Sequence, residues 1–346
     1  MLIKSSVETT RPHIIVFALY MLLLPIATSL SGIIGNVSLL NYVAIVYIGL
    51  YVLRNLDNTI VYNKKTNAIF LYFVFVMFST LYNFYSVAVW QVTTFASNGI
   101  IALLATTDTY TSNELKLIKK SIVLSSIIAI FVTLLNIESA LNFRLTITIS
   151  STMDSNDFAC GLVIILSLLL TMITRNNNRI LAIVLFSCCC GIIILSGSRG
   201  AMIMTIAIIC AWLFQSIKSK RVLIPLVLVL FITFLFIYFY EYIPEYLKNR
   251  LSIFALLEDG GSGRSKIWLA AINEFFDGNL FELLFGSGYG SFRGRVHYIA
   301  HGHSGAYESH NMWINLLIEG GVVGIVLLIW TFMQTYKIAK SQKNMC

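Results

Sequence analysis

Charged side chains are scarce in this sequence. Of its 346 residues, 12% are charged and 58% are hydrophobic, whereas a soluble domain normally has about a quarter of its residues charged. The composition therefore excludes an ordinary soluble globule and predicts a polytopic membrane protein. The net charge of +8 does not indicate a nucleic-acid partner, because basic residues of membrane proteins gather at cytoplasmic loop ends.

Cysteine motifs are lacking too. The six cysteines form no C-x-x-C, and most lie in or beside apolar runs, so we interpret them as small core residues and not as a disulfide framework. They are Cys160, Cys188, Cys189, Cys190, Cys210 and Cys346. H-E-x-x-H is also missing, and His297, His301 and His303 do not have a standard ligand spacing, so we predict no metal site.

Signatures for soluble nucleotides are missing as well. The chain has no G-x-x-x-x-G-K-[ST], no D-x-D and no dinucleotide fingerprint between a strand and a helix. We therefore expect no cofactor. Any group transfer would need a donor that arrives already activated.

Long apolar runs are abundant. Runs of about the 20 residues that a spanning helix needs lie at 13–34, 37–56, 67–90, 92–107, 119–136, 157–174, 180–197, 200–217, 222–240 and 311–336. Lys4 and Arg11 precede the first run as in a signal sequence, but no small-residue cleavage site follows. We therefore predict an uncleaved first span, and an all-α fold of about ten transmembrane helices.

Basic residues set the predicted orientation. With a cytoplasmic N-terminus, 16 of the 24 Lys and Arg residues fall on cytoplasmic segments, as the positive-inside rule requires. Short external loops keep only Arg144 and Arg199. We predict a transmembrane bundle of about nine spans over 1–240, a large external loop with amphipathic helices over 241–310, and a last span with a cytoplasmic tail over 311–346.

The external loop holds much of the polar sequence. Residues 246–258, YLKNRLSIFALLE, have the mixed basic and apolar character of a helix lying at the membrane surface. Farther on, Trp268, Ile272 and Phe275 recur at helical spacing and predict an amphipathic helix over 265–276. The following FGSGYGSFRGR is a glycine-rich turn region.

Two arginines stand at predicted external boundaries. Arg199, in SGSRGAM, is either a snorkelling anchor or an anion ligand, because its small neighbours leave room for a lipid headgroup. Arg264, in GSGRSKIW, is either an exposed loop charge or part of an anion site at the N-terminus of the predicted helix. Arginine suits bidentate recognition of phosphate, so the pair predicts a diphosphate site.

A histidine begins the last apolar run, in SHNMWINLLIEGGVVG. His310 is either an interfacial hydrogen-bonding residue or a proton-transfer group, because imidazole titrates near neutral pH. We expect Arg199, Arg264 and His310 to meet at one site. Gly320, Gly321 and Gly324 are expected to permit close helix packing.

Two carboxylates precede the run at 157–174, in TMDSNDFA. Paired carboxylates can do acid–base work, and an aspartate here can also cap the helix. We assign the N-cap to Asp157 and leave the role of Asp154 open.

These motifs together resemble the bacterial O-antigen ligase and polysaccharide polymerase group, the ligase/Wzy superfamily. SGSRGAM is similar to its arginine motif, and MDSNDFA to its Asp-Pro-Asn motif with Ser155 in place of proline. GSGRSKIW followed by LFGSGYGSF is similar to the Arg–Trp and glycine-rich part of its large periplasmic loop, and SHNMWINLLIEGGVVG to its His-Asn motif. The order of the motifs and the predicted topology also match.

The resemblance implies a GT-C-like, metal-independent, inverting glycosyltransferase of the bacterial inner (plasma) membrane. The implied donor is an undecaprenyl-diphosphate-linked oligosaccharide, held through Arg199 and Arg264, which would offset charge on the leaving group. His310 would be the general base on the acceptor glycan. Asn311 would bind the substrate or orient His310, and Asp154 would be a substrate ligand. Other expected partners are membrane lipids, a chain-length regulator and a flippase.

Only one predicted span follows His310, which favours a polymerase of O-antigen or capsule repeat units over a ligase that transfers finished glycan to lipid A–core. A transporter of lipid-linked glycan is a different class with similar composition. Transporters, however, place polar sites near the bilayer midplane and show internal repeats, and this sequence has no visible repeat. A non-enzymatic scaffold would give no reason for the two arginines and the histidine to share one side.

Overall fold

The computed structural model describes most of the chain. The described residues are 10–34, 37–56, 66–83, 89–142, 145–149, 152–174, 178–218, 264–296, 298–300, 303–305 and 309–343, with the single residues 230, 234, 238, 241, 245 and 248. The predicted span at 222–240 and the predicted surface helix at 246–258 lie outside the described residues, apart from some of these single positions.

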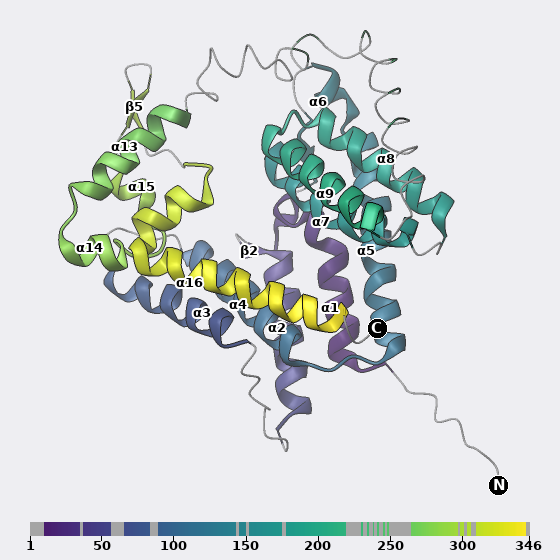
Figure 1. Cartoon of the computed structure of the whole chain (residues 1–346), viewed down its shortest axis with the longest axis horizontal. Helices are drawn as coiled ribbons and strands as arrows, with labels where there is room; N and C mark the ends of the chain where they lie inside the picture. The colour runs from purple at the N-terminus through teal and green to yellow at the C-terminus, as the bar shows by residue number, and fades with distance from the viewer. Residues whose placement is uncertain are drawn as a thin grey trace. The chain divides into compact units, whose positions relative to one another are not determined.

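The described residues are predominantly helical (Figure 1). The α-helices are α1 (Pro12–Leu23), α2 (Leu39–Arg54), α3 (Asn67–Ser79), α4 (Val89–Thr107), α5 (Ser112–Leu135), α6 (Ile137–Asn142), α7 (Ser155–Thr174), α8 (Arg179–Leu195), α9 (Arg199–Lys218), α13 (Arg264–Phe276), α14 (Leu280–Phe285), α15 (Phe292–Arg295) and α16 (Met312–Lys343). Short antiparallel pairs join β1 (Ser31–Ile34) to β2 (Val37–Ser38), β3 (Ile147–Thr148) to β4 (Thr152–Met153), and β5 (Tyr298–Ala300) to β6 (His303–Gly305). The predicted all-α class is confirmed.

Three described helices are long and apolar enough to cross a membrane, at Ser112–Leu135, Ser155–Thr174 and Met312–Lys337. Shorter apolar helices lie at Pro12–Ile26, Leu39–Arg54, Asn67–Tyr82, Val92–Thr107, Arg179–Leu195 and Arg199–Phe214. The chain is therefore a multi-pass membrane protein. The total of about ten spans stays a prediction.

The first predicted span, 13–34, is wrong as a single helix. α1 ends at Leu23, and two 3-10 segments, Leu24–Ile26 and Thr28–Leu30, precede β1. Pro25 explains the end of α1, because proline lacks the N–H donor and its ring clashes with the preceding turn of a helix. An apolar run of the right length does not guarantee one uninterrupted helix.

The helices group into two compact units, each made of two chain segments. The first unit comprises Met1–Val43 and Tyr110–Ala255, and the second comprises Ala44–Thr109 and Leu256–Cys346. The regions predicted from the sequence, 1–240, 241–310 and 311–346, describe position relative to a membrane and are a different division of the chain from these two packing units. They stay predictions.

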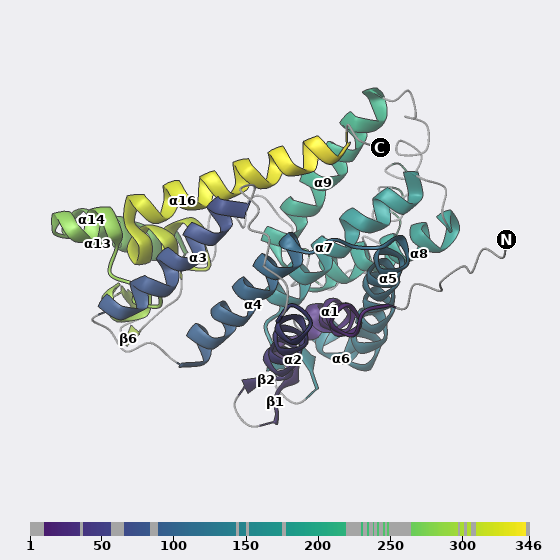
Figure 2. The same cartoon turned by 90° about the horizontal axis from the view of Figure 1, so that it is seen from below.

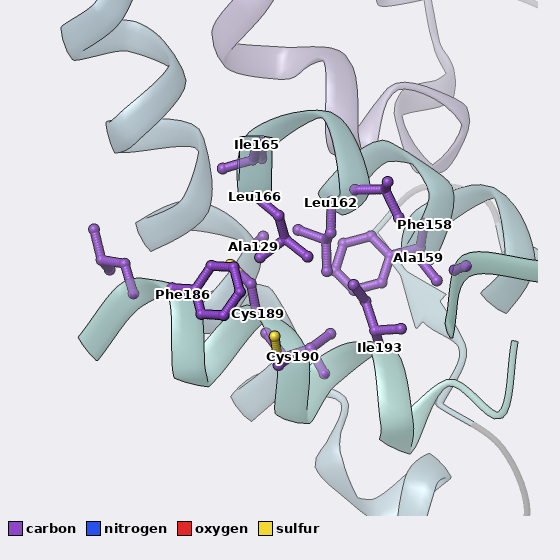
Figure 3. Close-up of a cluster of buried hydrophobic side chains, with 14 of the residues drawn as sticks. Ala129, Phe158, Ala159, Leu162, Ile165, Leu166, Phe186, Cys189, Cys190 and Ile193 are labelled. Carbon is purple, nitrogen blue, oxygen red and sulfur yellow. The ribbon is translucent and has the colours of Figure 1, made fainter. Parts of the chain in front are cut away.

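The first unit is built around α7. Figure 3 shows buried side chains of α7, among them Phe158 and Leu162, against Phe186 and Ile193 of α8. Cys189 and Cys190 are buried in this cluster, as predicted for small core residues. Cys188 and Cys210 are exposed, so for these two the prediction is wrong.

A hydrogen bond fixes the direction of α9 against α7. The indole Nε1 of Trp212, late in α9, donates to Oγ1 of Thr174, the last residue of α7, at 2.7 Å. α7 and α9 therefore run parallel, with α8 as the antiparallel return between them. The N-termini of α7 and α9 consequently lie at the same end of the first unit.

In the second unit, α3 runs beside α16 (Figure 2), while α13, α14 and α15 gather at the beginning of α16 (Figure 1). α13 confirms the helix predicted over 265–276. Its buried face is formed by Ile267, Ala271 and Phe275, which pack with Phe292 and Ile318. This face is rotated from the predicted one, because Trp268 lies at its edge, where its indole N–H has a polar partner.

α16 is broken at Gly321, whose φ of +58° and ψ of −161° are outside the helical region. Only glycine adopts this region readily. The predicted packing role holds for its neighbours, since added β-carbons at Gly320 and Gly324 would lie 3.4 and 3.2 Å from the Phe75 ring of α3. Gly321 differs from these neighbours, because its backbone interrupts the helix.

The glycine-rich loop between α14 and α15 fills this break. The Ser287 N–H donates to the carbonyl of Ile318 at 2.9 Å, and the Gly288 N–H donates to that of Glu319 at 3.0 Å. On its other side, the Tyr289 N–H donates to Ser79 Oγ at 3.1 Å. The loop therefore joins the end of α3 to the break in α16.

Close approach explains the glycine at the loop's first position. A β-carbon added at Gly286, where φ is +74°, would lie 2.3 Å from the carbonyl carbon of Glu319. We expect Gly286→Ala to lower the free energy of unfolding by at least about 2 kcal/mol, since backbone must move. Thermal unfolding in detergent measures this.

Gly49→Ala is the matched control in the same unit. An added β-carbon there would meet nothing within 4 Å in α2, and alanine favours a helix interior over glycine. An equal loss of stability in both variants would contradict this account of the loop.

Candidate functional site

His310 lies in a strained turn immediately before α16. Its φ is +49°, a conformation that is uncommon for residues other than glycine. The side chain of His310 is exposed, whereas Ser309 before it is buried. Strain of this kind persists where the surroundings hold it, and it clusters at functional sites.

Three hydrogen-bonding groups hold this turn. The Trp268 indole Nε1 of α13 donates to the backbone carbonyl of Ser309 at 2.8 Å. The Ser309 hydroxyl accepts from the Asn311 N–H at 3.0 Å and donates to Asn315 Oδ1. The backbone on both sides of His310 is therefore fixed, while its imidazole remains accessible.

Arg264 lies on the side of α13 that faces this turn. It is the first residue of α13 and precedes Trp268 by four positions, a spacing that places two side chains on the same helix face. Because Trp268 bonds to Ser309, the second unit brings Arg264 to the side of the His310 turn. The helix N-terminus there also favours an anion.

Asn311 is the N-cap of α16. Its Oδ1 accepts from the N–H groups of Trp313 at 3.0 Å and Ile314 at 3.4 Å, as an N-cap asparagine does. This structural role was not predicted, and its predicted role as a substrate ligand stays a prediction.

Arg199 begins α9, directly after a tight turn. Gly197 has a φ of +62°, and the Ser198 hydroxyl accepts from the Ala201 N–H at 3.5 Å. A β-carbon added at Gly200 would meet nothing within 4 Å. The backbone at Gly200 is thus open, whereas Ser196 and Ser198 are buried. Room for a ligand at the Arg199 guanidinium stays a prediction.

The predicted N-cap of α7 is wrong. α7 begins at Ser155, so Asp157 lies in its first turn. Asp154 is the capping residue, because its Oδ1 accepts from the Asn156 N–H at 2.6 Å. Since α7 and α9 begin at the same end of the first unit, Asp154 and Arg199 belong to that end.

Arg264 and His310 thus belong to the second unit, while Arg199 and Asp154 belong to the first. That all four meet at one site stays a prediction. His303 is in strand β6, whereas His297 and His301 lie outside the described residues. Within the described parts of the chain, no group of three or more His, Cys, Asp or Glu residues could hold a metal ion.

A buried arginine supports the second unit and was missed in the sequence. The Arg295 guanidinium contacts both oxygens of Glu282, one at 3.1 Å, and lies 3.3 Å from Glu274 Oε1. It also donates to the Ser287 hydroxyl of the glycine-rich loop. Burial alone would raise the pKa of Glu282, but the hydrogen bonds from Arg295 and the Asn279 backbone, with the arginine's charge, lower it.

Two further polar residues were not singled out as candidates. Trp268 was assigned only to an apolar face, although a buried indole N–H usually finds a hydrogen-bond partner. Glu319 is a carboxylate well inside an apolar run, and an ionisable residue in that position is a functional candidate by default. Ser309 was not singled out either, although its hydroxyl bonds to Asn311 and Asn315, which follow it closely in the sequence.

These features define a class, a multi-pass membrane protein that presents a histidine and an arginine on one side of its second unit. The family follows from comparison with known proteins. Residues 181–329 match the family described as O-antigen ligase (Wzy_C), and this segment contains Arg199, Arg264 and His310. Residues 181–329 are therefore similar to a membrane-protein family of surface-polysaccharide biosynthesis, and this match confirms the resemblance. No curated protein and no solved structure matches the chain.

The Glu282–Arg295 pair predicts an acid-sensitive second unit. Because the folded pKa of Glu282 is lowered, its stabilisation is complete above the unfolded value of about 4.3 and is lost as the pH falls through the folded value. We expect Glu282→Gln to lower the unfolding temperature at pH 7 and to approach the wild type in acid. Thermal unfolding from pH 7 to pH 3 measures this difference.

Asp277→Asn changes an exposed carboxylate at the end of α13 and should leave the unfolding temperature unchanged across this range. If the unfolding temperature of Glu282→Gln stays below that of the wild type by the same amount down to pH 3, the charge of Glu282 is not the stabilising feature.

Proposed function

We propose that the protein transfers an undecaprenyl-diphosphate-linked oligosaccharide to a hydroxyl of an acceptor glycan at the external face of the plasma membrane. The observation that carries the proposal is the 2.8 Å hydrogen bond from Trp268 to the Ser309 carbonyl. It joins the helix that begins at Arg264 to the turn that presents His310, within the segment that matches the O-antigen ligase family.

His310 is the proposed general base. Its exposed imidazole accepts the proton of the acceptor hydroxyl as that oxygen attacks the anomeric carbon of the donor. The new glycosidic bond forms while the bond from the anomeric carbon to the diphosphate oxygen breaks. A single displacement of this kind inverts the configuration of that carbon.

Arg264 is the proposed ligand of the diphosphate. Its guanidinium and the N-terminus of α13 both favour an anion, and negative charge grows on the diphosphate as it leaves. Arg199 of the first unit is proposed as the second arginine, and Asp154 as a ligand of the glycan. The positive charge of the arginines lets the proposed reaction proceed without a metal or cofactor.

Within the family, both polymerisation and ligation use this chemistry, because each attacks a lipid diphosphate with a sugar hydroxyl. We place polymerisation of repeat units first, following the sequence-based expectation. Ligation of finished glycan to lipid A–core is the second candidate, since the matching family description names ligation. We also propose that both termini are cytoplasmic and that a chain-length regulator and a flippase act together with the protein.

Surface glycans on a gel test the function. The gene is deleted in its host, and wild-type, His310→Ala and Arg264→Ala copies are put back. Loss of a general base costs about 10²-fold to 10⁴-fold in rate, and loss of a group that stabilises developing charge costs about 10²-fold to 10³-fold. Neither variant should therefore restore the ladder. A ladder reduced to one repeat unit indicates a polymerase, whereas unmodified lipid core with accumulating lipid-linked glycan indicates a ligase.

Lys266→Ala is the matched control, because it removes an exposed positive charge two residues after Arg264. It should restore the wild-type ladder at equal protein level. A normal ladder from His310→Ala would overturn the catalytic assignment and favour a transporter or scaffold.

Trp268 is a proposed positioning residue for His310. We expect Trp268→Phe to lower kcat for glycan transfer by about tenfold to a hundredfold, because small displacements of a catalytic group have costs of this size. The KM for the lipid-linked donor and the unfolding temperature should change little. Trp313→Phe, at an exposed indole of α16, should change none of these, and equal kcat in both variants would remove the positioning role.

A further inference from the structure

A pocket of about 250 Å³ lies in the second unit beside the His310 turn. Its walls come from α3, from the glycine-rich loop and from the first turns of α16. The lining residues are Tyr72, Phe75, Val76, Ser79, Tyr289, Met312, Asn315, Leu316, Glu319 and Gly320. The pocket is smaller than the 300–1,000 Å³ typical of drug-sized ligands, which suits a single ring.

The lining combines aromatic rings with hydrogen-bonding groups. Glu319 is half-buried, and its Oε1 accepts from the Phe292 N–H at 3.5 Å. Tyr72, Tyr289 and Asn315, residues with polar side chains, also line this space. Apolar walls with a few convergent polar groups are the usual construction of a small-molecule site.

Glu319 gives the pocket negative character. Burial raises the pKa of Tyr289 to about 12, and the charges of Glu319 and Tyr72 add to the effect. Tyr289 therefore stays a neutral hydroxyl that can donate a hydrogen bond. A phosphate or an acidic sugar would be repelled by Glu319, whereas the hydroxyls of an uncharged ring could donate to it.

The pocket is connected to the His310 turn. Met312, two residues after His310, lines it, and Asn315 both lines it and accepts a hydrogen bond from the Ser309 hydroxyl. A ring bound here would lie beside the base. The transferred donor sugar carries a diphosphate directly on its anomeric carbon, so the negative pocket suits the acceptor sugar better than the donor.

We propose that this pocket binds one uncharged sugar ring of the acceptor glycan, with Glu319 as its principal hydrogen-bond acceptor. The assignment as acceptor subsite rests on the proposed glycosyl transfer. The proposal that the pocket binds a sugar does not rest on glycosyl transfer, because it depends only on the pocket. The two can therefore fail separately.

Titration calorimetry on the purified full chain tests binding. The probe is the repeat-unit oligosaccharide of the host's surface polysaccharide, released from its lipid diphosphate by mild acid. We expect Glu319→Gln to weaken its binding at least tenfold and Tyr289→Phe to weaken it severalfold. Lys266→Ala and Asp277→Asn change exposed residues outside the pocket lining and should bind like the wild type.

A pair of simple sugars tests the role of charge. The wild type should bind methyl glucoside in preference to methyl glucuronide, and Glu319→Gln should lose this preference, which a merely structural role for Glu319 would not produce. Unfolding temperatures confirm that each variant is folded. Wild-type affinity of Glu319→Gln for the oligosaccharide, or an unchanged preference, would overturn the proposal.

Transfer kinetics separate acceptor from donor. Glu319→Gln should raise the KM for the acceptor glycan about tenfold and leave the KM for the lipid-linked donor unchanged. A rise confined to the donor KM would overturn the acceptor assignment. If no transfer occurs with the wild type, the proposed function fails, while the titration still reports whether the pocket binds sugar.

Discussion

The second unit depends on two hydrogen bonds across a break in its longest helix. Gly321 interrupts α16, and the carbonyls of Ile318 and Glu319 accept from the N–H groups of Ser287 and Gly288. A break in a membrane-spanning helix requires such partners, because carbonyls freed in hydrocarbon cannot turn to water. The requirement fixes the loop, and the loop in turn carries Tyr289 into the pocket and Ser287 to the buried Arg295. One local interruption therefore organises α14, α15 and the end of α3.

The same principle operates at the beginning of α16. The left-handed backbone at His310 is unfavourable by itself, and it is held by polar contacts on both sides, from Trp268 to Ser309 and from Asn311 to Ser309. A histidine held in this way has little backbone entropy left to lose when a substrate binds. Pre-organisation of a proton acceptor is worth most where the acceptor hydroxyl must be aligned with a reacting carbon. In the proposed reaction, the strained turn therefore serves to hold the His310 side chain in position for proton transfer.

Sequence reasoning predicted those features that depend on local pattern. The helix at 265–276 follows from the spacing of its apolar residues, and the packing of Gly320 and Gly324 on α3 follows from their small size. Features that depend on a distant partner were not predicted. The break at Gly321 exists because a loop some 30 residues earlier supplies donors, and the rotation of α13 exists because Trp268 has a partner at Ser309. The cap was assigned to Asp157, because two aspartates three residues apart are equivalent in pattern, and only the start of α7 distinguishes Asp154.

The proposed site separates its ligands by charge. Arg264, with the N-terminus of α13, would attract a diphosphate, while Glu319 would repel one some two turns into α16. A lipid-linked glycan has a matching asymmetry, because its charge is confined to the diphosphate and the sugars beyond can be neutral. In the proposed arrangement, His310 would lie between a site that attracts phosphate and a pocket that repels it, and the donor would be guided into one orientation. A second lipid-linked chain, whose own diphosphate must lie away from Glu319, would then enter with its sugar first, which is the orientation that a hydroxyl nucleophile requires.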